Sequence, residues 1–373
     1  MKNYDKNTDS HSSCRGGRYG KEWAVAIFSL LMATALPALA AMMVGISVGS
    51  GGEGFTENSM VCLCRHDIDG TEELTFGRLL ALSLAATNGS DTPAASLEAQ
   101  AILLRSRGVW WLDYCGSGED EGSEREDFSE NGESGETKSK KNGVQVEGSD
   151  KKGRKRDEVG EPFHPTLCNS PIHGMPYLSY HELVDLWGEE EADARLEAAE
   201  RAVKLTRGQV LCYEGEIVPA LLHHSSGGVT RSVENLPWLA AVATPETGHE
   251  AVITCSAEEV RNALAAGFGL LLPSDPLRWE LSLQTAEDGR VEWLTVVGEQ
   301  LPGSAVAEAL SLPSASFTVQ ADSDTLTFVC TGEGSGCGLS RAGAAIYAAG
   351  GLSCGEILAH YYPDCTVGVM GGS

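Results

Sequence analysis

The chain has 373 residues, of which 42% are hydrophobic, and it carries a formal net charge of −26 with an isoelectric point near 4.7. This length accommodates one large domain or two modest ones. The acidic balance excludes a nucleic-acid-binding role, because such proteins need a basic surface; it favours solubility and says little about fold.

The N-terminal region has the features of a membrane anchor. Residues 1–22 are polar and include basic residues, and no charged residue occurs in residues 23–50. Such a run exceeds the roughly 20 residues that cross a bilayer as a helix. The charge pattern predicts a cytoplasmic tail over 1–22, a transmembrane anchor over 23–48 and an extracytoplasmic C-terminal part, which makes a single-pass membrane protein. A signal-peptidase site at Ala38-Leu39-Ala40 is the alternative, although the apolar character continues beyond it.

A strand and two helices are predicted after a glycine-rich linker. Residues 60–64 have the composition of a strand, and the apolar spacing over residues 71–86 predicts an amphipathic helix. A turn-rich break precedes a second helix, which begins at Pro93 or Ser96 and ends at Gly108.

Residues 116–160 form a low-complexity segment with an acidic first part and a Lys/Arg-rich second part. Such a composition cannot bury enough apolar surface to fold, so it predicts a disordered insertion. A basic patch that contacts anionic wall polymers or lipid is the alternative interpretation.

The remaining elements mix helices with short strands. Helices are predicted over residues 180–188 and 192–204, and a third over 255–267 starts with a good capping residue, Ser256. Two strand pairs are predicted, over 279–283 with 291–297 around an Asp-Gly turn, and over 317–320 with 325–330. The whole pattern predicts an α+β fold.

One polar stretch near the middle of the chain has the composition of a binding site. From His223 to Leu239, side chains that can form hydrogen bonds surround a Gly pair, and Trp238 lies near the end. Paired glycines allow a sharp turn and let a ligand approach the backbone closely. These side-chain types suit a hydroxyl-rich ligand, and tryptophan offers a face to a sugar ring. A polar surface turn between two strands is the alternative.

Segments in the same order resemble the signatures of the SpoIID/LytB family. His224–Asn235, followed closely by the pattern Pro-Trp-Leu-x-Ala-Val-x-x-Pro over Pro237–Pro245, resembles the family's central signature. The others are Leu97–Arg105 (the EALKAQAVAART helix), Val203–Tyr213 (the AVxxTxGxVLxY strand entry), Gly332–Gly343 (the Gly-rich C-terminal signature) and Gly355–Tyr362 (the closing EILxHYY). The resemblance implies a single exported SpoIID-like domain over residues 55–365, interrupted by the insertion.

The resemblance also implies the chemistry of a lytic transglycosylase. A protonated carboxyl gives its proton to the glycosidic oxygen and the sugar's own 6-hydroxyl closes an anhydro ring, which requires an acid of raised pKa. The two glutamates usual in the family fall on Thr87 and Ala95, and neither is an acid. Glu98 lies three positions after Ala95 on nearly the same helix face, so it is the candidate substitute; an ordinary exposed helix glutamate is the alternative. Glu234 is a weaker candidate.

The C-terminal signature departs from the family pattern GxGHGVGMSQYGA. Its Gly framework and Ser340 are kept, whereas Ser335, Arg341 and Ala342 replace His, Gln and Tyr. A phosphate-binding loop is disfavoured because the GK[ST] ending is absent. The resemblance implies glycan contacts from both signatures, namely His224, Ser225, Ser226, Gly227, Gly228, Thr230, Ser232, Glu234, Asn235, Trp238 and Ser340.

A structural zinc is the one cofactor that the resemblance suggests, and no cofactor is required. The spacing of Cys168 and His173 resembles a zinc-binding segment of the family, and His164 would supply a third ligand, while Gly174 replaces a fourth. A surface loop with incidental His and Cys is the alternative. The eleven cysteines cannot all pair within one chain, and their pairing cannot be deduced from the sequence.

Two functions follow from the resemblance. The first is peptidoglycan remodelling during forespore engulfment by a lytic transglycosylase, with Glu98 as the acid. The second is a catalytically inactive glycan-binding scaffold or regulator of other engulfment hydrolases, favoured by the missing acid and the altered C-terminal signature. The implied partners are glycan strands, a membrane protein, and an amidase or endopeptidase of the engulfment machinery. A serine hydrolase that uses His224 with Ser225 or Ser226 is disfavoured, since no G-x-S-x-G motif accompanies them.

Overall fold

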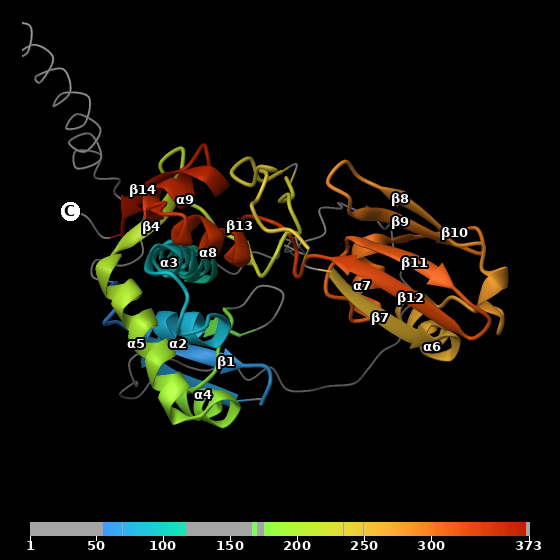
Figure 1. Cartoon of the computed structure of the whole chain (residues 1–373). Helices are drawn as coiled ribbons and strands as arrows, with labels where there is room; N and C mark the ends of the chain where they lie inside the picture. The colour runs from blue at the N-terminus through green and yellow to red at the C-terminus, as the bar shows by residue number, and fades with distance from the viewer. Residues whose placement is uncertain are drawn as a thin grey trace, which may run out of the picture. The chain divides into compact units, whose positions relative to one another are not determined.

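The computed structural model describes most of the chain after residue 54 (Figure 1). The described residues are 55–68, 70–116, 166–169, 175–233, 235–248 and 250–370. The predicted tail over 1–22, the predicted anchor over 23–48 and nearly all of the predicted insertion over 116–160 lie outside them. Within the described ranges, no helix is both long enough and apolar enough to cross a bilayer.

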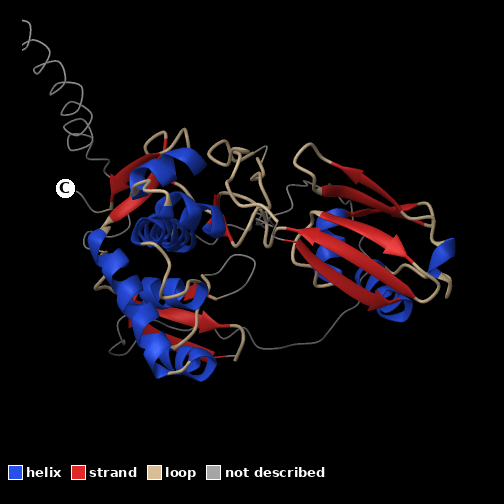
Figure 2. Ribbon diagram, in the orientation of Figure 1, coloured by secondary structure: helices blue, strands red, loops and turns tan. Residues whose placement is uncertain are grey.

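Helices and strands both occur throughout the described chain, which confirms the α+β class (Figure 2). The first part builds one core from a small sheet and four helices. Its elements are β1 (Met60–Arg65), β2 (Gly70–Thr75), α2 (Phe76–Thr87), α3 (Ala94–Gly116), β3 (Thr166–Cys168), α4 (Tyr180–Trp187) and α5 (Glu189–Leu205).

Strand β1 lies in the middle of this sheet, antiparallel to β2 and parallel to β3. Its side chains alternate, so that Val61 and Leu63 enter the core while the cysteines between them face outward. The helix predicted over residues 71–86 is wrong in its first turn. Residues 71–75 belong to β2 instead, where more exposed and less exposed side chains alternate, and Thr75 then caps α2 by accepting a bond from the Arg78 N–H.

Helix α3 is the centre of the first part, in contact with α2 and α5 on one side and with later helices on the other. The predicted end at Gly108 is wrong, because α3 continues to Gly116. A Cβ at Gly108 would lie 2.8 Å from ring carbons of Phe76, the first residue of α2. Glycine at this position therefore allows α2 to pack closely against α3, and it does not mark the end of α3.

A buried ion pair joins α3 to the start of the described chain. Arg105 is fully buried, and its Nε donates to Glu57 Oε1 at 3.1 Å, while its other nitrogens donate to backbone carbonyls of Val203 and Gln209. Glu57 also accepts a 2.7 Å bond from the Gly208 N–H. Three segments far apart in the sequence therefore meet at one charge pair.

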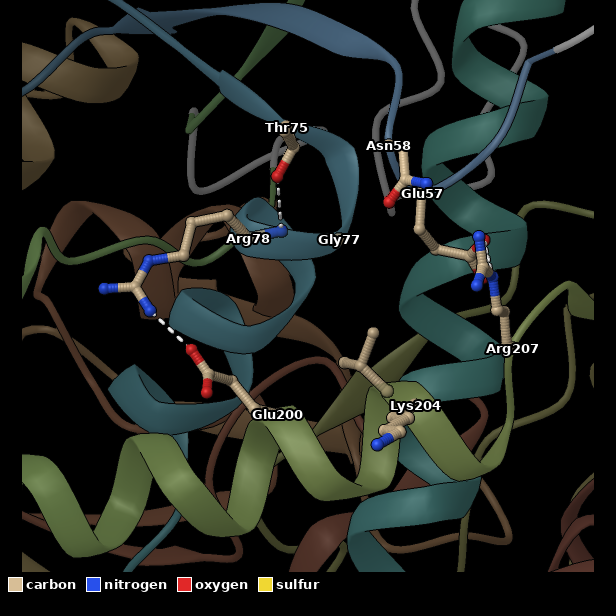
Figure 3. Close-up of a pocket in the computed structure, with 9 residues that line it drawn as sticks. Glu57, Asn58, Thr75, Gly77, Arg78, Glu200, Lys204 and Arg207 are labelled. Carbon is tan, nitrogen blue, oxygen red and sulfur yellow. Dashed lines mark hydrogen bonds and ion pairs between the residues drawn. The ribbon is translucent and has the colours of Figure 1, made fainter.

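A hollow of about 330 Å³ lies beside this pair, lined by Glu57, Arg78, Glu200, Lys204 and Arg207, among others (Figure 3). Arg78 Nη1 donates to Glu200 at 2.6 Å across it, and Arg207 lies 3.6 Å from Glu57. Its charges are therefore largely paired with one another. None of its lining residues belongs to the central or C-terminal signature.

The signature segments form a second core with α3. The elements here are β4 (Gln209–Tyr213), β5 (Glu216–Ile217), β6 (Leu222–His223), β13 (Leu339–Ser340), α8 (Arg341–Ala349), α9 (Cys354–Tyr361) and β14 (Thr366–Val369). Ala99, Ile102 and Leu103 of α3 pack against Leu339 and Ile357. The helix that resembles the family's EALKAQAVAART segment is thus the support of both signatures.

Residues 250–331 form a module with its own hydrophobic core around the fully buried Trp279. The first and last strands of the module in sequence order pair with each other, so that Glu250 lies opposite Thr331. The elements are β7 (Glu250–Ser256), α6 (Ala257–Phe268), η1 (Pro276–Arg278), β8 (Ser282–Thr285), β9 (Val291–Val296), β10 (Glu299–Pro302), α7 (Gly303–Ala309), β11 (Phe317–Ala321) and β12 (Thr325–Thr331).

Most elements predicted in this module are confirmed. Ser256 caps α6 with a complete capping box, and both predicted strand pairs are present and antiparallel. The first strand begins later than predicted, at Ser282, because Trp279 caps η1 and its indole N–H donates to the Pro273 carbonyl at 2.8 Å. The helices predicted over 180–188 and 192–204 correspond to α4 and α5.

Replacing Glu57 by Ala should lower the free energy of unfolding by about 3 kcal/mol, because the Arg105 charge would stay buried without its partner. Denaturant unfolding measures this loss. Glu197→Ala is the control: it removes an ion pair with Arg201 whose side chains are 75% and 65% exposed, and it should change stability little. Equal decreases in the free energy of unfolding of the two variants would show that the buried pair stabilises the fold no more than the exposed pair does.

Candidate functional site

Strands β6 and β13 bring the two signatures side by side. They pair in parallel, so that Leu222 lies opposite Leu339 and His223 opposite Ser340. Two further bridges, Ser225 with Glu333 and Arg231 with Cys337, continue the contact along the C-terminal loop. Segments more than one hundred positions apart therefore form one structural unit.

A buried carboxylate, Glu246, holds the two signatures together. Its Oε1 accepts bonds from the Ser226 N–H at 3.0 Å, the Ser226 hydroxyl at 2.6 Å and the Ser340 hydroxyl at 2.5 Å. Ser340 in turn accepts the Gly343 N–H at 3.1 Å at the start of α8. Both serines are buried, so their hydrogen bonds to Glu246 stabilise the two loops from inside the protein.

Burial acts to raise the pKa of Glu246, but the bonds from Ser226 and Ser340 outweigh it, and the pKa lies below its ordinary value. Glu246 is therefore a carboxylate at neutral pH. Its second oxygen is buried without a hydrogen-bond partner among the described residues, and it lies on the side of Gly343 and Pro245. Nothing larger than glycine fits at position 343, since a Cβ there would overlap the Tyr361 hydroxyl.

The closing motif supports this unit from behind. His360 Nε2 donates to the Ala243 carbonyl at 2.8 Å, and the Tyr362 hydroxyl donates to the Leu221 carbonyl, next to β6. Gly338 has a φ of +71°, and a Cβ at this position would overlap the Leu221 carbonyl oxygen. Only glycine therefore allows the C-terminal loop to lie this close to the Leu221 backbone. The glycines kept in the C-terminal signature therefore have a packing reason.

His223 is the most buried imidazole of the unit, 4% exposed. Its Nδ1 donates to the Cys337 carbonyl at 3.1 Å, which leaves Nε2 as the basic nitrogen. Desolvation lowers its pKa to about 4. The ring is consequently neutral at pH 7 and acts as a structural link between the signatures.

At the end of α2, one position where the family has a glutamate is in contact with a changed residue of the C-terminal signature. Arg341 Nη1 donates to the backbone carbonyl of Thr87, the residue that stands where the family has a glutamate. Burial lowers the pKa of Arg341, and Glu333 opposes that shift, but the guanidinium remains charged at neutral pH. A cation therefore lies beside the place where the family has an acid.

Comparison with curated proteins finds the same relationship as the motifs. Stage II sporulation protein D of Bacillus amyloliquefaciens is 29% identical over 215 residues, which cover 55% of this chain and 61% of the relative. The protein of the same name from Bacillus subtilis (strain 168) is 28% identical over 195 residues, or 50% of this chain and 55% of the relative. This chain resembles stage II sporulation protein D. No protein-family model matches it.

The match spans less than two thirds of both relatives, at 61% and 55% of their lengths. The resemblance relates the chain to sporulation and leaves its reaction, substrates and partners to be inferred.

Glu98 lies on α3, half-buried and away from the Glu246 cluster's hydrogen bonds. Cys354, the first residue of α9, has its pKa raised to about 12 by burial and by the Glu98 charge. Glu98 thus faces α9. Ala95, the other position of a family glutamate, packs against the core formed with the signatures.

The predicted glycan contacts divide into buried and reachable groups. Ser225, Ser226, Thr230 and Ser340 are buried; Thr230 Oγ1, for instance, donates to the Ala240 carbonyl at 3.0 Å. Gly227 and Gly228 form the turn, with φ of +74° and +128°. Ser232 and Asn235 are exposed, the His224 side chain is 40% exposed, and the half-buried Trp238 packs 6.0 Å from the Tyr213 ring. Glu234 lies outside the described residues.

The zinc prediction stays a prediction. Cys168 ends β3, while His164 and His173 lie outside the described residues. Among the residues that the structure does describe, no group of three His, Cys, Asp or Glu side chains is arranged to hold a metal.

Sequence reasoning missed two residues of this site, Glu246 and Arg290. Glu246 directly follows Pro245, seven positions after Leu239, and it has no motif of its own. Arg290 comes from the module, and its buried guanidinium lies against Gly336, 3.8 Å from Asp288. Neither has a local signal, because each acquires its role from partners far away in the sequence.

Glu246→Ala should lower the free energy of unfolding by about 3 kcal/mol, because three hydrogen bonds from the buried Ser226 and Ser340 are lost. Glu246→Gln should recover part of this loss, since its amide oxygen can accept the same bonds. Denaturant unfolding of both variants, with the exposed Glu308→Ala as a control, measures the difference. A loss no larger than that of the control would contradict the role of Glu246.

The stability of the protein should fall as pH drops from about 6.5 to about 4, the ordinary and folded pKa values of His223. In this window the unfolded chain binds a proton that the folded chain resists, with a slope of at most about 1.4 kcal/mol per pH unit. His223→Gln should flatten this part of the curve, measured by denaturation at a series of pH values. An unchanged slope would assign the effect to other groups.

Proposed function

We propose that this chain is a sporulation protein that binds peptidoglycan glycan strands at the surface formed by its two signatures, without the family's usual acid chemistry. The pairing of β6 with β13 and the Glu246 bonds support a formed binding surface. Reachable hydroxyl, amide and imidazole groups at Ser232, Asn235 and His224 suit hydroxyl-rich sugars.

The contact between Arg341 and Thr87 is the main support for the proposed absence of acid catalysis. A general acid must reach the glycosidic oxygen as a protonated carboxyl. Threonine cannot supply that proton, and a neighbouring guanidinium would favour the ionised form of any nearby acid. The remaining carboxyl of the cluster, Glu246, is ionised and bound to two serines.

The rest of the proposal follows from the resemblance and the N-terminal sequence. The chain would be held in the membrane by residues 23–48, with its C-terminal part outside the cytoplasm. There it would act as a scaffold or regulator beside an amidase or endopeptidase and a membrane protein of the engulfment machinery.

A lytic transglycosylase that uses Glu98 is the second candidate. The observation that favours it is the position of Glu98 on α3, half-buried and next to Cys354, one turn after the position of a family glutamate. A partly apolar neighbourhood of this kind is what a general acid needs.

An experiment with the purified chain and peptide-free glycan strands distinguishes the two candidate functions. Pull-down would measure binding, and mass spectrometry would search for products that end in anhydro-muramic acid. We expect binding without such products. Loss of one or two hydrogen bonds in a His224→Ala, Asn235→Ala double variant should weaken binding by about tenfold or more, whereas Thr318→Ala on the exposed side of β11 should not.

Anhydro products would overturn the proposal in favour of the second candidate, and Glu98→Gln should then abolish them while the protein stays folded. Absence of binding to any glycan preparation would contradict both candidates.

A further inference from the structure

Three cysteines share the outer face of the small N-terminal sheet. Cys62 and Cys64 alternate with the buried Val61 and Leu63 along β1, so they point away from the core. On the neighbouring strand β3, Leu167 is buried and Cys168 is half-exposed. The outer face therefore carries thiols from two segments about one hundred positions apart.

The strand register places two of these thiols directly opposite each other. β1 and β3 are parallel, with Leu63 opposite Leu167 and Cys64 opposite Cys168. Paired strands lie about 4.8 Å apart, which falls inside the span of about 4.4–6.8 Å that separates the Cα atoms of a disulfide. Because Leu63 and Leu167 both face the core, Cys64 and Cys168 both face outward, on the same side.

No other strand pair in the described chain places cysteine opposite cysteine. The Cys212 thiol contributes to the raised pKa of Cys365, so these two residues are neighbours as well. However, Cys365 precedes β14, and the residue opposite Cys212 is Thr366, so no strand register pairs Cys212 with Cys365. Register therefore singles out Cys64 and Cys168.

We propose that Cys64 and Cys168 form a disulfide that fastens β3 to β1. The two thiols give up two protons and two electrons and gain one S–S bond. A low-molecular-weight or protein disulfide takes up both, and its own S–S bond breaks to give two thiols. The bond belongs to an oxidising compartment, which agrees with the predicted export of this part of the chain.

The link has a structural purpose in this position. β3 has three residues and lies at the edge of its sheet, so few backbone hydrogen bonds hold it. A covalent bond to the central strand would fix the register and close a long loop in the unfolded chain, which favours the folded state. It would also exclude Cys168 from a zinc site, because one sulfur cannot serve both.

The test uses the full chain, reduced, treated with EDTA to remove metal, and then oxidised with oxidised glutathione. Free thiols are alkylated, the protein is digested without reduction, and linked peptides are identified by mass spectrometry. We expect a reducible link between the peptides that contain Cys64 and Cys168. The oxidised protein should also unfold at a higher denaturant concentration than the reduced one.

Single variants identify the sulfur atoms. Cys62→Ser should retain both the link and the stabilisation, whereas Cys64→Ser and Cys168→Ser should lose both; Cys255→Ser in the module is the matched control. Full alkylation of Cys64 and Cys168 in the oxidised, folded protein would overturn the proposal. Survival of the link in Cys64→Ser would overturn it as well, since Cys62 would then be the partner.

Discussion

The geometry of the signature surface depends on one buried carboxylate. A carboxylate is expensive to remove from water unless hydrogen bonds replace its hydration, and Glu246 obtains them from Ser226 and Ser340. Those serines belong to different signatures, and Ser340 lies 94 positions after Glu246 in the sequence. The cost of leaving Glu246 unpaired therefore couples the two loops, and either loop would relax without the other.

Around this support, the chain departs from its relatives in charge. The pattern residues that touch Glu246 are present, while Thr87 and Arg341 replace a glutamate and a glutamine of the family patterns and lie in contact. The hydrogen bonds that hold the two signatures together are thus separate from the positions where the family patterns have a glutamate and a glutamine. Changes at those positions leave the bonds of Glu246 in place.

Local signals allowed much of the fold to be predicted. Ser256 and its capping box begin α6 where expected, because capping depends on residues only three positions apart. Gly108 misled the helix prediction, since its role is to admit Phe76 from another helix. The resemblance implied ligand contacts from both signatures, but the motifs did not predict that Ser226 and Ser340 are buried, nor that Glu246 binds them. Those facts depend on tertiary contacts that no short window of sequence contains.

The module over residues 250–331 enters and leaves the fold at one point, because Glu250 and Thr331 face each other across β7 and β12. Such an arrangement makes the module a detachable unit in the topological sense. The chain path on either side, from Glu246 to Gly332, would remain nearly continuous if a short turn replaced it. Exchange of this segment would thus alter what lies beside the two signatures, including the Arg290 contact with Gly336, while the hydrophobic cores of the rest of the chain stay the same.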